Sequence, residues 1–249
     1  MVIVDGYSID RTLDVVSTYF PNARILQHKG NLAQCRKVGI QASQGEYICM
    51  IDSDIVVPPS FFGMLQFFDN DVGCVTGIFD FVGDSFLKEY DEHERERLQL
   101  KKIGVIETDE SVAAACTIYR AFLLKRCLPD ARLFAGEDKD MALSIVDLGY
   151  KILIDTDMVC AHIRKSSLPD EMRRNFIFGE ITHILFDSHP NYKRKIWKRR
   201  CLSLFASLIF PFYYFLKVRK IKYAVAAWLL ALSYNLGFLF SRITPSRRY

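Results

Sequence analysis

The stretch Tyr47-Ile48-Cys49-Met50-Ile51-Asp52-Ser53-Asp54 decides the fold. It begins as an apolar run rich in β-branched and aromatic residues, which is typical of a strand that is covered on both faces. The run stops at two carboxylates, Asp52 and Asp54, and open α/β sheets bind their ligands at this end of a strand. In a bent turn both carboxylates reach one hard cation such as Mg²⁺ or Mn²⁺. Taken alone, the pattern also fits a solvated turn that caps the next helix.

The segments before this stretch alternate between strand and helix patterns. The expected elements are a strand ending at residue 4, a helix over 13–20, a strand over 24–27 and a helix over 32–42. Alternation of this kind predicts an α/β fold with a mainly parallel sheet and right-handed crossovers. Later patterns predict a helix from Pro58 to Phe68, a strand over 72–81, an exposed helix over 84–102, a helix over 141–148 and a last strand over 151–155, and residues 159–162 end the globular core.

Charge divides the 249-residue chain into two parts. From Ser188 to Tyr249 there are 13 Lys and Arg and no Asp or Glu, which leaves 20 basic and 29 acidic residues before it, a formal charge of −9. A basic tail that also contains long apolar runs favours a membrane over nucleic acid as its partner. The seven cysteines have no zinc-binding spacing, so we expect reduced thiols, with Cys49, Cys74 and Cys116 in the core.

Two further polar motifs follow apolar segments. Glu137-Asp138-Lys139-Asp140 opens a helix, where carboxylates are also favoured by the helix dipole alone. His162 ends the last apolar segment, and a histidine in this position is more often a core or surface residue than a ligand. Neither motif identifies a site without the others.

The order of the motifs is more specific than any one of them. Along the chain the order is Val4-Asp5-Gly6-Tyr7-Ser8-Ile9-Asp10-Arg11-Thr12, Gly30-Asn31-Leu32-Ala33-Gln34-Cys35-Arg36, Ala42-Ser43-Gln44-Gly45-Glu46 leading to Asp52-Ser53-Asp54, Gly136-Glu137-Asp138-Lys139-Asp140, and Val159-Cys160-Ala161-His162. Over residues 1–162 this series resembles a family 2 glycosyltransferase of GT-A fold. The resemblance implies a Rossmann-like sheet that binds a nucleotide sugar.

The resemblance also implies a role for each motif of the donor site. Asp5 matches the acid that contacts the base or ribose, and Arg36 matches a basic residue that helps to hold the nucleotide. Asp52 and Asp54 match the metal-binding Asp-x-Asp motif, with Asp52 nearer the ribose. His162 matches a residue found near the metal or the diphosphate. The implied cofactor is Mg²⁺ or Mn²⁺, and the implied donor is a UDP- or GDP-linked sugar.

Asp138 matches the general base of inverting members of the family, with Glu137 beside it. A carboxylate in this place takes the proton of the acceptor hydroxyl as the hydroxyl attacks the anomeric carbon.

Two departures from the family pattern stand out. The chain begins in what is usually the second strand, and the Gln-x-x-Arg-Trp signature of processive synthases is absent, which favours transfer of one sugar per encounter.

The C-terminal part carries two apolar runs behind a basic segment. Residues 193–200 supply the basic collar, and the runs cover about 201–216 and 223–241. At about 1.5 Å per residue they reach ~24 and ~27 Å, against a hydrocarbon core of ~30 Å. We expect a hydrophobic helical hairpin that spans the membrane, and a hairpin lying in the membrane plane is the alternative. The expected domains are 1–165 (GT-A, catalytic), 166–200 (helical and basic) and 201–249 (membrane-associated).

These observations predict a glycosyltransferase of the hexosyltransferase type. It would sit at the cell membrane with its catalytic domain on the cytoplasmic side, and would transfer a single sugar to a lipid-linked or cell-envelope glycan acceptor, with no nucleic-acid partner. One alternative is a truncated, non-catalytic relative that binds a partner. A sugar-nucleotide nucleotidyltransferase is less favoured, because the sequence has no Gly-rich N-terminal loop with a basic residue for a triphosphate.

Overall fold

A computed structural model describes residues 1–82, 88–90, 104–108, 113–163, 167–197 and 221–243 of the chain. The chain forms two compact units. The first unit consists of Met1–Ser53, Pro58–Ile78 and Val105–Met158. The second unit consists of Asp54–Val57, Phe79–Gly104 and Val159–Tyr249. The domain boundaries expected at residues 165 and 200 stay predictions.

The first unit begins with a parallel strand pair and its crossover helix. Strand β1 (Val2–Asp5) pairs with β2 (Arg24–Gln27), so that Asp5 lies opposite Gln27, and helix α1 (Thr12–Tyr19) connects them. Helix α2 (Leu32–Ala42) follows, and it begins with a capping box between Asn31 and Gln34. The capping box satisfies free N–H groups at the start of the helix, which fixes where the helix begins.

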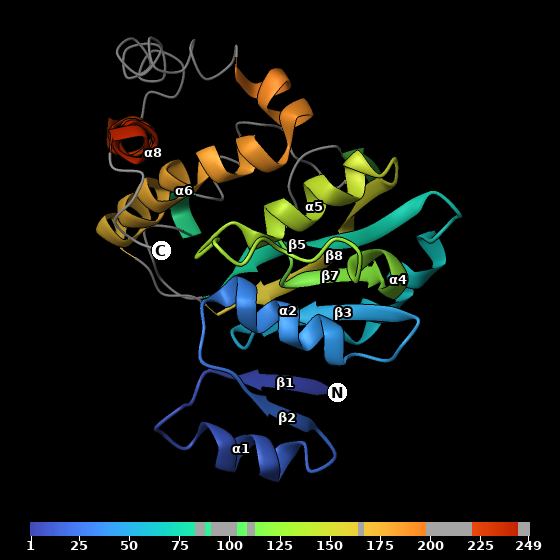
Figure 1. The fold of residues 1–249 in the computed structure, drawn as a ribbon. Helices are drawn as coiled ribbons and strands as arrows, with labels where there is room; N and C mark the ends of the chain where they lie inside the picture. Colours follow the sequence, from blue (N-terminus) through green and yellow to red (C-terminus); the bar gives the residue numbers. More distant parts are fainter. Residues whose placement is uncertain (83–87, 91–103, 109–112, 164–166, 198–220, 244–249) are drawn as a thin grey trace. The chain divides into compact units, whose positions relative to one another are not determined.

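A larger sheet forms the centre of the first unit (Figure 1). Its strands are β3 (Tyr47–Ile51), β7 (Cys116–Arg120), β5 (Val72–Phe81) and β8 (Lys151–His162), in this order, and β6 (Val105–Thr108) pairs with β8. The 3₁₀ helix η1 (Pro59–Phe67) lies in the chain between β3 and β5. The α/β fold class is therefore confirmed.

The pairs β3–β7, β5–β7 and β6–β8 of this larger sheet are antiparallel, which the expectation of a mainly parallel sheet did not include. Strand β7 runs antiparallel to both of its neighbours, with Tyr119 opposite Ile48 of β3 and opposite Cys74 of β5. Strands β3 and β5 consequently point the same way, as a crossover connection requires. The alternation of patterns predicted the direction of these two strands, but it could not predict that a strand from later in the chain would lie between them.

The core of the first unit lies where this sheet meets two helices. Helix α4 (Ala121–Leu124) follows β7, and helix α5 (Glu137–Asp147) precedes β8. The largest fully buried side chains of this cluster are Tyr119, Leu123, Leu124, Met141, Ile145, Ile152 and Ile40. Because α5 buries its apolar face in this cluster, its N-terminal turn is held in one position relative to the sheet.

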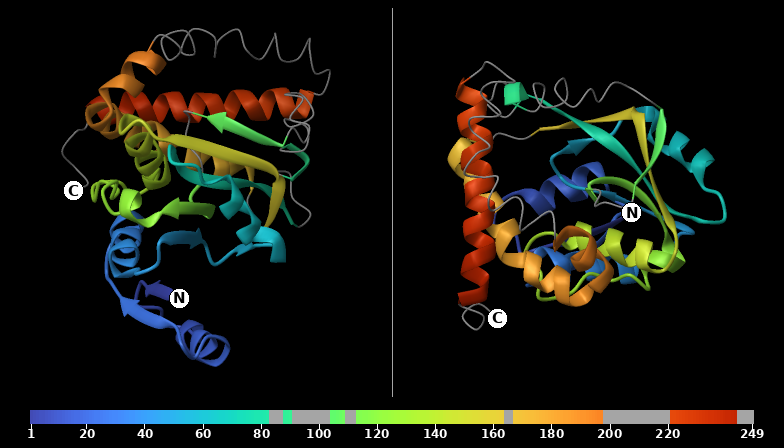
Figure 2. Two further views of the ribbon diagram at one scale, coloured as in Figure 1. Left: turned by 90° about the vertical axis from the view of Figure 1, so that its right-hand side faces the viewer. Right: turned by 90° about the horizontal axis from the view of Figure 1, so that it is seen from above.

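The second unit contains a short strand and two long helices. Strand β4 (Ile55–Val56) pairs with the end of β8. Helix α6 (Leu168–Ser188) and helix α8 (Ile221–Ile243) cross each other, as Figure 2 shows. A Cβ atom on Gly179 would lie 2.1 Å from the carbonyl oxygen of Tyr234, and a Cβ on Gly237 would overlap the carbonyl oxygen of Phe176. Glycine at these positions therefore allows the two backbones to touch.

The second apolar run of the sequence lies within α8. Among the described residues this helix, over Ile221–Ser241, is long and apolar enough to cross a membrane, a test that a core helix of a soluble protein also passes. The first apolar run, at 201–216, lies outside the described residues, as do most of the basic loop before α8 and most of the helix expected at 84–102. The structure thus describes only one of the two helices of the expected hairpin.

The thiol prediction is only partly right. Cys35, Cys49, Cys74 and Cys127 are free, whereas Cys116 and Cys160 are disulfide-bonded. The apolar surroundings of Cys116 pointed to a reduced core residue, but burial on its own says nothing about the presence of a second thiol within bonding distance.

Candidate active site

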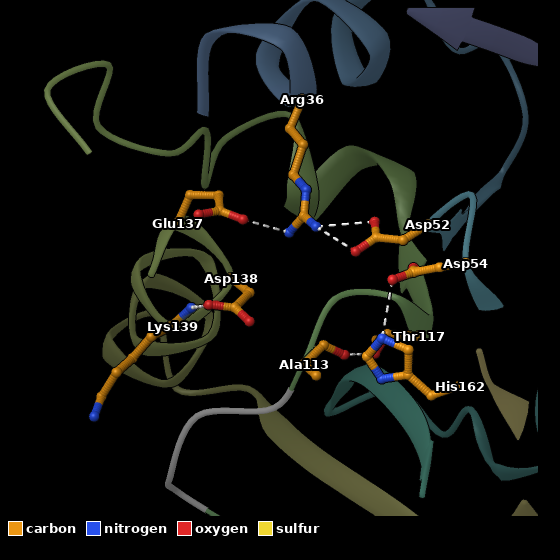
Figure 3. Close-up of polar contacts among 9 residues, drawn as sticks. All are labelled: Arg36, Asp52, Asp54, Ala113, Thr117, Glu137, Asp138, Lys139 and His162. Atoms are coloured by element: carbon orange, nitrogen blue, oxygen red, sulfur yellow. Dashed lines mark hydrogen bonds and ion pairs between the residues drawn. The ribbon is translucent and has the colours of Figure 1, made fainter. Parts of the chain in front are cut away.

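A buried ion triad joins α2, the end of β3 and the start of α5 (Figure 3). Arg36 Nη2 donates to both carboxylate oxygens of Asp52, at 2.9 and 3.1 Å. Arg36 Nη1 lies 2.7 Å from Glu137 Oε1 and forms an ion pair with it. The side chains of Arg36 and Glu137 are only 9% and 4% exposed, whereas that of Asp52 is 41% exposed. The triad therefore has one accessible member, Asp52.

Local sequence sets the position of each member of the triad. Ala33 and Ile40 bury one side of α2, which turns Arg36 towards the carboxyl end of β3. Gly136 adopts φ = 71° before the first turn of α5, a conformation that glycine reaches without steric strain. The chain thereby enters α5 with Glu137 in the first turn, where the helix dipole favours an anion.

Burial and charge change the pKa values of these groups. Burial raises the pKa of Glu137 above its ordinary value, although the Arg36 charge acts against this shift. Burial also raises the pKa of Asp138, again opposed by Arg36. Burial alone would lower the pKa of Arg36, but Glu137, Asp52 and Asp138 together raise it. Arg36 is therefore a permanent cation, and the two carboxyl groups of α5 bind protons more tightly than solvated ones.

Asp138 is the half-buried neighbour of Glu137. Its Oδ1 accepts the backbone N–H of Lys139 at 2.7 Å. Within the described part of the chain its Oδ2 has no hydrogen-bond donor. A half-buried carboxylate with an unbonded oxygen and a raised pKa is a candidate proton acceptor.

A second polar pair, Asp54 and His162, lies in the second unit. Strand β4 pairs with β8 so that Ile55 lies opposite His162, and His162 Nε2 lies 3.0 Å from Asp54 Oδ2. The imidazole ring lies between Phe79 and Phe81, at centroid distances of 5.5 and 5.2 Å. Its Nδ1 is buried and has no hydrogen-bond partner among the described residues. The two rings fix the imidazole, and its Nε2 faces a carboxylate that is 46% exposed.

The Asp54–His162 pair has the chemistry of a divalent-cation site. Carboxylate oxygen and imidazole nitrogen together suit Mn²⁺, and carboxylates suit Mg²⁺. The part of the chain that the structure describes holds no group of three or more His, Cys, Asp or Glu arranged to bind a metal ion.

Asp5 lies at the end of β1, and its carboxylate accepts hydrogen bonds from the turn that follows and from β2. Its carboxylate accepts hydrogen bonds from the Tyr7 and Ser8 N–H groups at 3.1 and 3.2 Å, from Ser8 Oγ at 2.5 Å and from Gln27 Nε2 at 3.1 Å. The hydrogen bonds from Ser8 and Gln27 lower the pKa of Asp5. Asp5 is thus an ionised anchor for the turn after β1.

The structure brings together three of the expected site residues, Arg36, Asp52 and Glu137, in one cluster. It pairs Asp54 with His162 in another, and it places Asp138 beside Glu137. Sequence reasoning did not foresee that Arg36 binds Glu137, which lies 101 residues later.

The family assignment rests on a match to a sequence model. Residues 1–127, which include Asp5, Arg36, Asp52 and Asp54, match the model described as Glycosyl transferase family 2. The chain belongs to glycosyltransferase family 2. This match favours the glycosyltransferase over the nucleotidyltransferase interpretation. A search of curated proteins found no match.

Solved glycosyltransferase structures share the fold. The crystal structure of S. aureus TarS 1-349 is 16% identical with a TM-score of 0.50, over 99% of this chain and 83% of that one. TarS 1-349 in complex with UDP-GlcNAc is 14% identical with a TM-score of 0.50, over 97% and 82%. GalNAc-T7, crystallised with UDP, GalNAc and Mn²⁺, is 16% identical with a TM-score of 0.50, over 72% of this chain and only 43% of that one. At these identities the likeness shows a GT-A-type fold alone.

Proposed function

We propose that this chain transfers one sugar from a UDP- or GDP-linked donor to an acceptor hydroxyl with inversion at the anomeric carbon. The observation that carries the proposal is the Asp52–Arg36–Glu137 triad with the accessible carboxylate of Asp138 next to it. Structures of the same fold were solved with UDP-GlcNAc or with UDP and Mn²⁺. These support a nucleotide-sugar donor for this chain as well.

Asp138 is the proposed general base. The acceptor hydroxyl gives its proton to Asp138 Oδ2 while the hydroxyl oxygen forms a bond to the anomeric carbon. The bond from that carbon to the β-phosphate oxygen breaks, and its electron pair leaves with the nucleoside diphosphate. The raised pKa of Asp138 suits this role, because a base is most effective when its pKa is close to the working pH. Single displacement of this kind inverts the configuration.

Asp54 and His162 are the proposed cation ligands in the second unit. Their facing atoms, 3.0 Å apart, and the ring contacts of His162 with Phe79 and Phe81 support this assignment. Asp52, two residues before Asp54 in the sequence, remains a predicted further ligand. A bound divalent cation would neutralise charge on the departing diphosphate. Arg36 holds Asp52 in place and supplies a positive charge that does not titrate in the physiological range.

The proposed setting is the cytoplasmic face of a membrane, with a lipid-linked or envelope glycan as acceptor. The exposed apolar residues of α8 recur at helical spacing, which supports contact with lipid: Ile221, Val225, Leu236, Leu239 and Phe240. The opposite side of this helix packs against α6, for example through Phe238, whose ring contacts that of Phe186. The basic residues at 193–200 would face anionic lipid headgroups.

The deciding experiment measures binding of UDP and GDP by titration calorimetry, with and without Mn²⁺. It uses the wild-type chain, Asp54→Ala and the matched control Asp14→Ala, whose carboxylate on α1 is 75% exposed. We expect Mn²⁺-dependent binding that is lost in Asp54→Ala and kept in Asp14→Ala. If folded wild-type protein binds neither nucleotide, the donor-site proposal is wrong and the non-catalytic alternative takes its place.

A further inference from the structure

Asn31 uses both ends of its side-chain amide. Its Oδ1 accepts the backbone N–H of Gln34 at 2.9 Å and so caps the start of α2. Its Nδ2 donates to the backbone carbonyl of Ala131 at 2.8 Å, 100 residues later in the chain. A helix cap needs only the acceptor oxygen, which serine or aspartate would supply equally well. The amide N–H₂ of Asn31 therefore makes a contact that capping does not require.

The loop that Asn31 contacts, residues 128–136, leads directly into α5. This loop is also tied to the first turn of the helix, because the backbone N–H of Asp130 donates to Asp140 Oδ2 at 2.7 Å. Asp140 is only 4% exposed, so this bond is well shielded from water. The loop and the helical turn that carries Asp138 are therefore held together.

Helix α2 and the start of α5 are thus joined at two points. One is the ion pair of Arg36 with Glu137, at 2.7 Å, and the other is the hydrogen bond of Asn31 with Ala131. Along α2 these points lie about 7 Å apart, since each residue advances a helix by about 1.5 Å. A single contact would let the first turn of α5 pivot, whereas two contacts fix its orientation. Asp138 follows Glu137 directly, so this orientation decides where the Asp138 carboxylate points.

We propose that Asn31 is a positioning residue for Asp138 in the transfer reaction. This inference rests on the proposed function. Asn31 acts through the loop at 128–136 rather than by contact with a substrate, and it keeps the proposed base at a fixed separation from Asp52, which Arg36 holds. Misplacement of a reacting group by about 1 Å costs up to about a hundredfold in rate. One hydrogen bond that orients the loop therefore matters more for the reaction than for stability.

The test uses two variants at position 31 and a matched control. Asn31→Asp and Asn31→Ser keep an acceptor for the cap of α2 and lose the amide donor to Ala131, so we expect melting temperatures within about 3 °C of wild type. The control is Asn175→Ser. Asn175 Nδ2 donates to the backbone carbonyl of Glu171 at 2.9 Å, so this variant loses a hydrogen bond of the same kind inside α6.

The first readout is amide hydrogen exchange, measured by mass spectrometry on the loop at 128–136 and the first turn of α5. We expect exchange about two- to tenfold faster in both position-31 variants and unchanged in Asn175→Ser. The second readout is the rise in melting temperature caused by Asp138→Asn at pH 7, measured with Asn31 or with Asn31→Ser. We expect this rise to fall by about half in Asn31→Ser, because the released loop lets water reach Asp138. A merely structural role for Asn31 would leave the rise unchanged.

A third measurement separates this inference from the proposed function. Calorimetry with UDP and Mn²⁺ should give affinities within about twofold of wild type for Asn31→Ser, because the donor side is untouched. If the wild-type chain binds no UDP, the proposed function is wrong and the inference fails with it. If the wild type binds UDP while exchange and the Asp138→Asn rise do not respond to Asn31→Ser, the proposed function stands and the positioning role is overturned. A response in Asn31→Asp alone would also overturn it, because it would assign the effect to the new charge.

Discussion

Replacing Arg36 by methionine tests the buried ion triad most directly. Methionine keeps much of the apolar stem of arginine and removes the charge, so Glu137 is left ionised at 4% exposure without its partner. At the Nη1–Oε1 separation of 2.7 Å, the Coulomb attraction at an effective dielectric constant near 20 is about 6 kcal/mol before the cost of desolvation. Loss of one partner of a buried pair costs about 3–5 kcal/mol, and we expect Arg36→Met to lower the free energy of unfolding by that amount.

The assay is urea unfolding followed by far-UV circular dichroism at pH 7. The matched control is Arg132→Met, since Arg132 lies 2.6 Å from Asp130 but is 54% exposed. An exposed pair of this kind is worth about 0–1 kcal/mol. The double variant Arg36→Met/Glu137→Gln should recover part of the loss, because a neutral amide no longer needs a counter-charge.

Two results would refute this reasoning. The first is a loss below about 1 kcal/mol in Arg36→Met, which would mean that water reaches Glu137 and screens it. The second is a double variant no more stable than Arg36→Met, which would mean that the arginine acts through packing rather than through its charge.

Two further predictions concern Asp138 and the helix crossing. Asp138→Asn should abolish sugar transfer yet raise the stability of the chain at neutral pH. Because burial raises the pKa of Asp138, the wild-type chain loses stability as the pH rises from the ordinary value of 3.8 to the raised pKa. The stability gained by the asparagine variant should therefore vanish below pH 3.8. Thermal unfolding at several pH values measures this gain, and a gain that does not change with pH would contradict it. Gly179→Ala should stabilise by about 1 kcal/mol from helix propensity alone. We expect instead a loss of about 1–3 kcal/mol, because the new Cβ overlaps the Tyr234 carbonyl. Fluorescence of Trp197 and Trp228, the chain's two tryptophans, follows this change, and a stabilised variant would show that the helices do not touch there.

Strand and helix limits near the centre of the fold could be predicted from the sequence. The strand Tyr47–Ile51 and the helix Leu32–Ala42 have the expected bounds. Both carry strong local signals: a continuous apolar run that ends at Asp52, and Asn31 and Gln34 at capping-box spacing. Local signals suffice when the residues that define an element lie within it.

Predictions from local patterns failed where contacts between distant segments determine the extent of a strand. The last strand was expected to end at residue 155, but β8 runs without a break from Lys151 to His162. Asp155 lies inside this strand, where its Oδ1 accepts the Asp157 N–H. Pairing with β6 and β4 on the neighbouring positions overrides the local preference of these residues.

The candidate site could be predicted as a set of residues but not as a set of contacts. Every residue named from the motifs is polar, and all of them except Arg36, which lies inside α2, are found at a strand end or a helix start. No local pattern indicates that Arg36 holds Asp52 and Glu137 at once. That arrangement depends on α2, β3 and α5 being packed together, which only the folded chain specifies.

The position of β7 between β3 and β5 has a consequence for the synthesis of this protein. Strand β3 ends at Ile51 and its partner begins at Cys116, so β3 leaves the ribosome long before it can pair. At about 5–20 residues per second, these intervening residues take roughly 3–13 s to synthesise. During that interval the edges of β3 and β5 are open to other nascent chains. Ribosome pausing before residue 116 should therefore increase aggregation, and pausing after residue 120 should not.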